Sequence, residues 1–361
     1  MASVLQIVDL TKTYGSVAAV DHINLSIAAD QYVSLLGPSG AGKTTFLRLI
    51  AGFEEPDAGE IVLGGQRINN MPAHRRGIGF VFQNFALFPH LTVEDNVAYG
   101  PLNRDGGRAE RGAVAKRVRD MIRLVGLGGL EDRSVHQISG GQRQRVALAR
   151  TLITEPRLVL LDEPLGALDA NLRESMRAEL RAIRERLGVT FLHVTGSETE
   201  ALAMGDTVIV LDGGRVAQIG VPGTVYDCPA TPNVARFLNR YNLFRGTLAG
   251  DVFMAGAGRF PVDGAIRIGG DTAKLDPAYA IRYDRVDVRS TQAIETPEEI
   301  AIEGAFVASE YTGATIVSFF ALDDGALFEV EAHLSHRAPP HYTEKQRYGL
   351  VWKPQDAIVF S

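Results

Sequence analysis

Hydrophobic residues recur at distinct spacings in the first part of the chain. Ile23, Leu25 and Ile27 alternate with polar residues, which is the period of a strand with one buried face. Residues 158–161 form a continuous apolar run, Leu-Val-Leu-Leu, and such a run is typical of a strand buried on both faces. A third pattern, with apolar residues at helical spacing and arginines and glutamates between them, predicts a helix through Leu172, Met176, Leu180, Ile183 and Leu187.

Predicted strands and helices alternate through this part of the chain. The apolar run Val33-Ser34-Leu35-Leu36 ends in a glycine-rich turn, and a helix is predicted from Thr44 to Ala51, where Gly52 ends it. Residues 92–150 are mainly helical in pattern, and buried strands are predicted at 190–195 and 207–211. Alternation of this kind predicts an α/β domain in which helices cover both faces of a parallel sheet.

The pattern changes after about residue 235, where helical periodicity largely disappears. Short strands and turns follow, for example at 314–322, 327–332 and 348–359. We therefore expect a second, smaller β domain, and we expect the boundary to lie within 230–242.

Composition and charge exclude several classes of protein and partner. The 361 residues, 45% of them hydrophobic, are enough for two domains with sizeable cores. The net charge of -6 argues against nucleic acid as a partner, because no overall positive field attracts phosphates. The single cysteine, Cys228, excludes an intramolecular disulfide and fits a reducing compartment. The N-terminus lacks a secretory pattern, and no stretch approaches the roughly 18 apolar residues of a membrane helix.

The strongest chemical signal lies between the predicted strand at 33–36 and the predicted helix after it. It matches the phosphate-binding pattern G-x-x-x-x-G-K-[ST] and consists of Gly37, Pro38, Ser39, Gly40, Ala41, Gly42, Lys43 and Thr44. Glycines let backbone N–H groups approach phosphate oxygens, and the helix N-terminus adds a partial positive charge. We expect Lys43 to reach the β- and γ-phosphates and the Thr44 hydroxyl to bind Mg²⁺.

A second signal follows the apolar strand at 158–161. Asp162 and Glu163 come directly after it, at the strand end where ligands of open α/β sheets bind. We expect Asp162 to hold the Mg²⁺ shell and Glu163 to polarise an attacking water. The two motifs together predict a nucleotide hydrolase or a nucleotide binder.

A third signal opens a predicted helix about twenty residues before Asp162. Small residues there expose backbone N–H groups at a helix start, in the run Ser139, Gly140, Gly141, Gln142, Arg143, Gln144 and Arg145. This run resembles the signature sequence of ABC proteins, with Ile138 where leucine is usual. In that family the signature faces the ATP that is held by the partner subunit.

With three motifs in this order, residues 4–235 resemble the ATPase subunits of ABC importers. The resemblance implies a P-loop ABC ATPase domain over 1–235, with a helical subdomain at about 86–155, and a small all-β OB-like domain over 236–361. Its residues imply ATP and Mg²⁺ as cofactors. The implied metal ligands are Thr44, Gln83 and Asp162, the implied catalytic residues are Glu163, Gln83 and Lys43, and Thr45 joins the phosphate-binding residues.

The resemblance implies further roles outside the phosphate-binding motifs. Tyr14 matches the aromatic residue that stacks on adenine, and Gln83 matches the glutamine that senses Mg²⁺ and the attacking water. Asp169 belongs to a loop, Gly166-Ala167-Leu168-Asp169, that crosses the dimer interface. The region from Gln83 to Pro89 is similar to the groove that receives a helix of the membrane permease.

The second part of the chain resembles, more diffusely, the OB-like C-terminal domain of importers for maltose, polyamines, ferric iron and sulfate. Residues 242–246 and 349–352 carry this resemblance. The implied partners are a permease, a second ATPase subunit in a homodimer and, indirectly, a periplasmic or extracellular solute-binding protein. The implied location is peripheral, at the cytoplasmic face of a bacterial inner membrane.

One position departs from the family pattern. Most such ATPases have V-T-H-D where this chain has Val194-Thr195-Gly196-Ser197, so Gly196 replaces the switch histidine that contacts the γ-phosphate. His193 is the nearest candidate substitute, but we expect an ordinary strand histidine, because it lies about 10 Å upstream along a strand and on the opposite face. Loss of one such contact costs roughly 10²–10³ in rate, and we expect slow or differently assisted hydrolysis.

Three functions are compatible with the sequence. The first is a homodimeric ATPase that drives solute import, and the second is a regulatory or degenerate subunit that clamps ATP with little hydrolysis, which Gly196 favours. The third is a soluble ABC ATPase of DNA repair or translation, but proteins of that kind resemble tandem or coiled-coil architectures. Within the importers, residues 164–169 and 351–356 are most similar to polyamine-type ATPases, with ferric-iron and sugar importers as close alternatives.

Overall fold

The computed structural model describes residues 3–103, 111–166, 168–238, 240–269, 277–291, 299–335 and 339–361. Ala167, which lies in the predicted interface loop, is outside the described residues. The chain divides into two compact units, Met1–Asp227 and Cys228–Ser361. None of the helices in the described part of the chain is long and apolar enough to cross a membrane.

The first unit alternates strands and helices, as its sequence pattern predicts. In chain order its elements are β1 (Ser3–Tyr14), β2 (Val17–Ala28), β3 (Tyr32–Leu36), α1 (Lys43–Ala51), β4 (Ala58–Leu63), β5 (Gln66–Arg67), η1 (Ala73–Arg75), β6 (Ile78–Val81), α2 (Val93–Asn103), α3 (Arg111–Leu124), η3 (Val135–Gln137), α4 (Gly140–Leu152), β7 (Leu158–Asp162), α5 (Ala170–Leu187), β8 (Thr190–Thr195), α6 (Glu198–Met204), β9 (Thr207–Asp212), β10 (Arg215–Gly220) and α7 (Pro222–Asp227).

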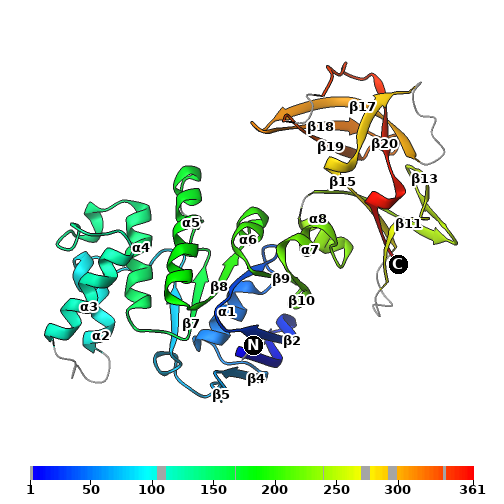
Figure 1. Ribbon diagram of the computed structural model, residues 1–361. Coiled ribbons are helices and arrows are strands. Elements are labelled where there is room, and N and C mark those ends of the chain that lie inside the picture. Colours follow the sequence, from blue (N-terminus) through cyan, green and yellow to red (C-terminus); the bar gives the residue numbers. More distant parts are fainter. Residues whose placement is uncertain are drawn as a thin grey trace. The chain divides into compact units, whose positions relative to one another are not determined.

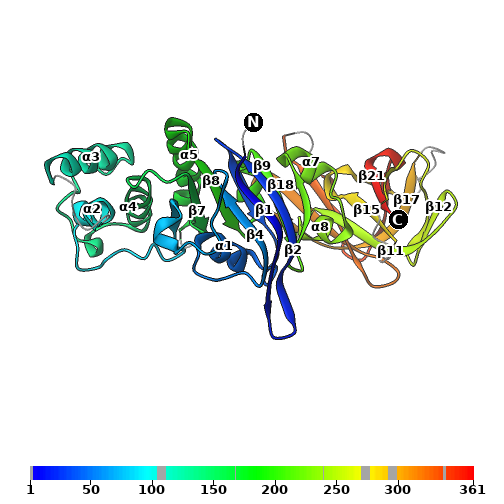
Figure 2. The same cartoon turned by 90° about the horizontal axis from the view of Figure 1, so that it is seen from below.

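Two sheets form this unit. The larger one has the strand order β10-β9-β3-β8-β7-β6, and every neighbouring pair except β9 and β10 is parallel. The smaller one, β2-β1-β4-β5, is antiparallel, and Figure 2 shows β1, β2 and β4 running side by side. The parallel sheet expected from the sequence is therefore confirmed, and it brings the C-terminal ends of β3, β7 and β8 to one edge.

Hydrophobic clusters lie on both faces of the parallel sheet. Val159 and Leu161 of β7 belong to one cluster, which includes residues of α2, α3, α4 and α5. Leu158 and Leu160 belong to the other, which includes residues of α1 and of the antiparallel sheet. Successive side chains of a strand point to opposite faces, so an uninterrupted apolar run is what a strand between two buried layers requires.

The helical region consists of α2, α3 and α4, which pack against one another and form a group at the left of Figure 1. Val114, Val118 and Ile122 of α3 are buried at helical spacing. Asp95 and Glu94 lie in the first turn of α2, where negative side chains are favourable beside the helix N-terminus. The sequence of α3 thus has the apolar spacing of an amphipathic helix, and that of α2 has the acidic residues that favour a helix N-terminus.

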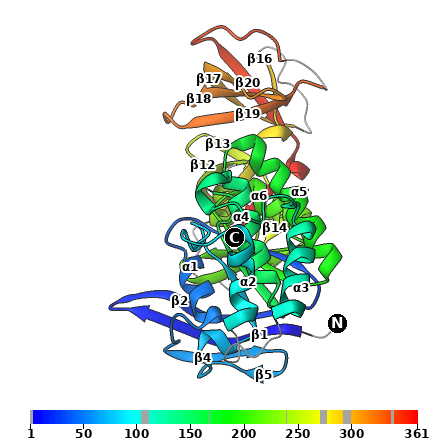
Figure 3. The same ribbon diagram turned by 90° about the vertical axis from the view of Figure 1, so that its left-hand side faces the viewer.

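The second unit is built mainly from strands. Its elements are α8 (Pro232–Phe237), β11 (Tyr241–Ala249), β12 (Val252–Ala255), β13 (Gly258–Pro261), β14 (Ile266–Ile268), β15 (Ala278–Arg282), η4 (Tyr283–Arg285), β16 (Asp287–Ser290), β17 (Ile300–Tyr311), β18 (Thr315–Ala321), β19 (Leu327–His333), β20 (Arg347–Trp352), η6 (Pro354–Asp356) and β21 (Ala357–Phe360). They form two sheets, β13-β12-β11-β15-β21-β14 and β16-β20-β17-β18-β19, and Figure 3 shows β16 to β20 gathered together.

An aromatic core holds the second unit together. Trp352 is 2% exposed, its ring lies 5.9 Å from that of Phe328, and its Nε1 donates a 2.9 Å hydrogen bond to the Tyr279 hydroxyl. The expected all-β character is confirmed. The strands at 315–321 and 327–333 lie within two residues of their predicted bounds, whereas the stretch predicted at 348–359 is divided by η6, in which Pro354 has no N–H to continue a ladder.

Candidate functional site

The glycine-rich loop joins β3 to α1, as predicted. Gly42 has φ 92°, and a Cβ there would lie 1.9 Å from the carbonyl oxygen of Ala19. Gly42 is therefore required both by its backbone conformation and by a close approach. Gly40 also has a positive φ of 81°, but a Cβ there would meet nothing within 4 Å. The loop consequently leaves open space beside Gly40, in front of the first turn of α1.

Lys43 lies across this loop. Its Nζ donates hydrogen bonds to the carbonyl oxygens of Gly37 at 2.6 Å and Pro38 at 2.8 Å, and only 8% of the residue is exposed. Burial lowers the pKa of Lys43, against the opposing effect of the nearby Glu163 and Asp162 carboxylates. A partly desolvated ammonium at a helix N-terminus, where the first backbone N–H groups have no helical partner, is an arrangement that binds anions.

The strand β7 brings two carboxylates to the same edge. Burial raises the pKa of Asp162, and the neighbouring Glu163 raises it further. Glu163 has φ 43°, in the left-handed region, and its N–H donates to the carbonyl oxygen of Val194 at 3.0 Å. Non-glycine residues rarely adopt this conformation, so the turn after β7 is held by its hydrogen bond to β8.

Gln83 and Glu163, which are 80 residues apart, are brought into contact. The Gln83 Nε2 donates to Glu163 Oε2 at 3.0 Å. Both side chains follow neighbouring parallel strands, β6 and β7, which explains how distant positions meet. The amide nitrogen faces the carboxylate, which leaves the Gln83 amide oxygen as a separate acceptor.

The oxygen donors at this edge differ in kind. Thr44 supplies a hydroxyl on the exposed side of α1, Gln83 an amide oxygen and Asp162 a carboxylate. Such hard oxygen ligands suit Mg²⁺. Among the described residues no cluster of three or more His, Cys, Asp or Glu side chains forms a metal site. The donor set therefore fits Mg²⁺ better than a metal that requires sulfur or imidazole ligands.

Tyr14 lies at the end of β1 and is 48% exposed. Its hydroxyl donates to the Glu54 carboxylate, which also lies 3.1 Å from the Arg48 guanidinium, and Lys12 Nζ is 5.7 Å from the ring centroid. The ring is held at its hydroxyl and has Lys12 over one face, which leaves its other face available for stacking. Glu54 carries no motif of its own, and only the fold brings it to Tyr14.

The signature run begins α4. Ser139 caps the helix by accepting from the Gln142 N–H at 3.3 Å, and the Gln142 side chain accepts from the Ser139 N–H at 2.9 Å. These reciprocal bonds form a capping box. A Cβ on Gly141 would lie 2.9 Å from a methyl group of Leu172. Within the described residues, no hydrogen bond or ion pair joins residues 139–142 to the glycine-rich loop.

Asp169 caps the next helix. Its carboxylate accepts from the Leu172 N–H at 3.0 Å at the start of α5. Arg173 of the same helix donates to the Leu168 carbonyl oxygen at 3.1 Å, and its Nε lies 3.6 Å from Glu200. These hydrogen bonds hold Leu168 and Asp169 at the start of α5.

The turn after β8 is built around Gly196. Thr195 donates to the buried Glu200 carboxylate at 2.8 Å, and the Ser197 N–H donates to the Thr195 hydroxyl at 3.0 Å. A Cβ on Gly196 would meet nothing within 4 Å. His193 is fully buried with Nδ1 3.2 Å from the Tyr32 hydroxyl, and burial lowers its pKa to about 3. The His193 imidazole therefore lies in the core and not in the open space beside Gly196.

The region Gln83–Pro89 is less uniformly exposed than an open aromatic groove. Phe85 is 8% exposed and belongs to the core, and Phe88 is half-buried against Tyr99, with ring centroids 4.3 Å apart. Tyr99 is 43% exposed. The aromatic surface of this region thus comes partly from α2, which the sequence did not indicate.

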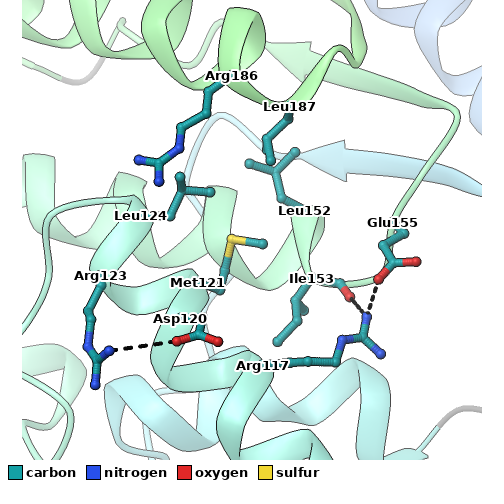
Figure 4. A pocket seen from close by; sticks show the side chains of 10 residues that line it. All are labelled: Arg117, Asp120, Met121, Arg123, Leu124, Leu152, Ile153, Glu155, Arg186 and Leu187. Carbon is teal, nitrogen blue, oxygen red and sulfur yellow. Dashed lines mark hydrogen bonds and ion pairs between the residues drawn. The ribbon is translucent and has the colours of Figure 1, made fainter.

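A cavity of about 590 Å³ lies elsewhere in the first unit, among α3, the end of α4 and the end of α5 (Figure 4). Its floor is apolar, and two of its three arginines are paired, Arg117 with Glu155 at 2.7 Å and Arg123 with Asp120 at 3.7 Å. None of the predicted site residues lines it.

Two known protein families match this chain, one in each of its two units. Residues 20–166 match the ABC transporter family model, and residues 279–360 match the TOBE domain model. The spermidine/putrescine import ATP-binding protein PotA of Nitrosomonas europaea is 42% identical over 346 residues, which cover 93% of this chain and 92% of that protein.

Two further proteins extend this comparison. The sulfate/thiosulfate import ATP-binding protein CysA of Caulobacter vibrioides is 42% identical over 322 residues, which cover 89% of this chain and 90% of that protein. A solved dimeric ATP-binding cassette, in a post-hydrolysis state bound to ADP and Pi, is 32% identical with a TM-score of 0.54 and covers 60% of this chain and 98% of that one.

Proposed function

This chain belongs to the ATP-binding subunits of ABC importers, which hydrolyse ATP, and we propose that the solute it helps to import is a polyamine. The observation that carries this proposal is similarity along both units. A PotA protein of Lawsonia intracellularis is 37% identical over 97% of this chain, and the PotA of Nitrosomonas europaea is 42% identical over 93%. A sulfate/thiosulfate relative is equally identical over a slightly shorter range, so sulfate is the competing solute.

In this proposal the edge of the parallel sheet binds and hydrolyses ATP. Residues 37–45 bind the phosphates, with Lys43 released from the Gly37 and Pro38 carbonyl oxygens when phosphate oxygens replace them. Tyr14 stacks on the base. Glu163 accepts a proton from the attacking water, and Gln83, bonded to Glu163 at 3.0 Å, holds that carboxylate in position.

Thr44, Gln83 and Asp162 would hold Mg²⁺, since their hydroxyl, amide and carboxylate oxygens suit that ion. Bound there, the ion would neutralise charge on the phosphate oxygens. Burial and the neighbouring Glu163 raise the pKa of Asp162 more than Arg48 and Lys43 lower it, and a further cation beside Asp162 would lower that pKa again.

A second copy of the chain completes each site in the proposed homodimer. Residues 139–142 present a capped helix start that makes no hydrogen bond or ion pair to the chain's own phosphate loop among the described residues. The N–H groups of Ser139 and Gln142 are used in the capping box, so those of Gly140 and Gly141, in the first turn of α4, would face ATP on a partner subunit. Asp169 lies in the adjoining interface segment, and the dimeric structure of a similar cassette supports this assembly.

The permease is the other proposed partner, through the region Gln83–Pro89. That region begins at the residue bonded to Glu163 and includes the half-buried Phe88, so a partner that binds it lies close to the chemistry. A solute-binding protein would act on this chain only indirectly. We place the subunit at the cytoplasmic face of the membrane, where the permease would hold it.

Transport measurements test the solute. The chain is purified with the permease that accompanies it, reconstituted in liposomes with the solute-binding protein, and supplied with ATP on its own side. We expect ATP-dependent uptake of labelled spermidine that unlabelled putrescine reduces and sulfate does not. Uptake of sulfate in place of spermidine would replace the polyamine assignment.

A second candidate function is ATP clamping with little hydrolysis. The open space at Gly196 favours it, because no side chain there reaches toward the γ-phosphate. A single-turnover experiment separates the two functions. Release of Pi within the lifetime of the bound nucleotide supports the hydrolase, and ATP retained intact for many minutes supports the clamp.

A further inference from the structure

The turn that follows Gln83 has an unusual backbone. Phe85 has φ 64° and Ala86 has φ 45°. They are the one pair of consecutive non-glycine residues with positive φ among the residues that the structure describes. Side chains make this conformation unfavourable, so the turn requires an external restraint to persist.

Arg150, in the last turn of α4, supplies such a restraint. Its two terminal nitrogens donate to the carbonyl oxygens of the same two residues, Nη1 to Ala86 at 2.8 Å and Nη2 to Phe85 at 3.0 Å. The guanidinium also lies 5.3 Å from the ring centroid of Phe88, within the range of a cation–π contact. One planar group therefore contacts three residues of the turn.

Arg150 is available for this task because it has no competing acidic partner. No carboxylate in the described part of the chain lies within ion-pair distance of it. It is half-buried, and burial lowers its pKa, yet an arginine remains charged at neutral pH. A desolvated cation without a carboxylate is costly unless its donors are satisfied, and here the carbonyl oxygens of the turn satisfy them.

The far side of the turn is held from α2. Asn96, which is fully buried, accepts from the Phe88 N–H at 2.9 Å and donates to the Phe88 carbonyl oxygen at 3.1 Å. The segment 85–88 is thus held by one side chain from each of two helices. Two residues before this segment lies Gln83, whose Nε2 donates to Glu163 Oε2 at 3.0 Å.

We propose that Arg150 is a positioning residue that holds the strained turn at Phe85 and Ala86, so that the placement of Gln83 beside Glu163 follows the position of α4. The inference rests on the proposed function, because it takes Gln83 and Glu163 as the hydrolytic pair. The helix α4 begins at the signature residues 139–142 and ends at Arg150. Movement of the start of α4, when a partner's nucleotide binds, is thereby carried to a turn that lies within the region Gln83–Pro89.

Hydrogen exchange of the full-length chain tests, in the absence of ATP, whether Arg150 holds the turn at Phe85 and Ala86. The Phe85 and Ala86 N–H groups donate within the turn, to Phe82 at 2.9 Å and to Asn84 at 2.8 Å. In Arg150→Ala these two amides should exchange at least about tenfold faster, while amides in the middle of α4 are unchanged. Arg119→Ala, an exposed arginine on α3, is the matched control. Unchanged exchange in Arg150→Ala overturns the proposal.

Steady-state kinetics of the reconstituted transporter test the positioning role. We expect Arg150→Ala to lower kcat about tenfold and to leave KM for ATP within about twofold, because the nucleotide-binding residues are untouched. Lysine at this position keeps the charge but cannot form the fork to two carbonyl oxygens, so Arg150→Lys should recover only part of kcat.

A glycine at position 86, which removes the backbone strain, provides the most specific test of the role of Arg150. Ala86 is exposed, and glycine adopts φ 45° without strain. Adding Ala86→Gly to Arg150→Ala should therefore raise kcat about threefold over the single variant. No rescue, or equal losses in kcat, ATP affinity and melting temperature, would assign Arg150 a merely structural role. If the wild-type transporter were inactive, the proposed function would be wrong. Hydrogen exchange would still show whether Arg150 holds the turn.

Discussion

At the scale of single residues, the substitution at position 196 sets the expected rate. Gly196 follows Thr195, whose hydroxyl is fixed by Glu200 at 2.8 Å, and the space for a side chain there is open. The turn is therefore formed without the imidazole that the family pattern has at this position. The structure explains how the fold tolerates the change, because neighbouring side chains hold the turn.

Restoring the imidazole should increase turnover. A Gly196→His side chain would meet no atom within 4 Å at its Cβ, and Gly196 does not have a positive φ. One well-placed donor is worth roughly 10²–10³ in rate, so we expect kcat to rise at least tenfold. Phosphate release by the reconstituted transporter measures it. Gly196→Ala is the control, which fills space without a donor, and an equal rise in both variants would exclude hydrogen bonding as the cause.

His193 makes stability depend on pH. Burial lowers its folded-state pKa to about 3, although Glu200 Oε2 lies 4.0 Å from its Nε2, and Tyr32 occupies Nδ1. The unfolded chain, with a pKa near 6.5, then binds more protons than the folded chain between pH 6.5 and about 3. Stability attributable to His193 is therefore present above pH 6.5 and is lost as pH falls, by about 2 kcal/mol at pH 5.

Urea unfolding followed from pH 7.5 to 5 checks this. Because glutamine does not titrate, the unfolding free energy of His193→Gln should fall by about 2 kcal/mol less than that of the wild type over this pH range, whatever its value at pH 7.5. Parallel curves for the two proteins would contradict the assignment of a neutral buried imidazole.

At the scale of elements, the loop between β3 and α1 depends on two glycines for different reasons. An alanine at Gly42 would combine φ 92° with a 1.9 Å contact to the Ala19 carbonyl oxygen, whereas an alanine at Gly40 would have only φ 81° to accommodate. The left-handed conformation alone costs about 1–2 kcal/mol for a non-glycine residue. Gly40→Ala should therefore lower the unfolding free energy by about that amount, and Gly42→Ala by clearly more.

The same pair of variants should separate in nucleotide binding. Gly42→Ala moves the start of α1 and should weaken ATP binding at least about tenfold, since the backbone donors lie there, while Gly40→Ala should have a smaller effect. Titration with a fluorescent ATP analogue measures both. Equal affinities in the two variants would show that the contact with Ala19 does not position the loop.

Elements with uninterrupted patterns were predictable from the sequence, and contacts between elements were not. The run at 158–161 indicated a buried strand because its two faces enter two cores. Glu54 and Arg150 carry no local pattern, since their partners lie 40 and more than 60 residues away. Their roles arise from tertiary hydrogen bonds, which periodicity does not encode.

At the scale of the whole molecule, the two units have separate cores. Trp352 is the single tryptophan and is buried in the core of the second unit. The residues that we propose to bind ATP all lie in the first unit. The fluorescence of Trp352 therefore reports on the unfolding of the second unit.

ATP should stabilise the two units unequally. At about 100 times its Kd, a ligand adds roughly 2.7 kcal/mol to the unit that binds it. We expect Mg-ATP to raise the unfolding midpoint of the helical circular dichroism signal, which comes mainly from the first unit, and to leave the Trp352 fluorescence midpoint unchanged. An equal shift in both signals would show that the units unfold as one.

Phosphate release by the reconstituted transporter decides whether this chain hydrolyses ATP at Glu163 despite Gly196. Glu163 is the carboxylate that Gln83 contacts at 3.0 Å, and loss of a general base costs about 10²–10⁴ in rate. We predict measurable turnover in the wild-type protein and a fall of at least about 10² in Glu163→Gln, with ATP binding retained. Wild-type turnover indistinguishable from that of Glu163→Gln would show that Glu163 does not act as the general base.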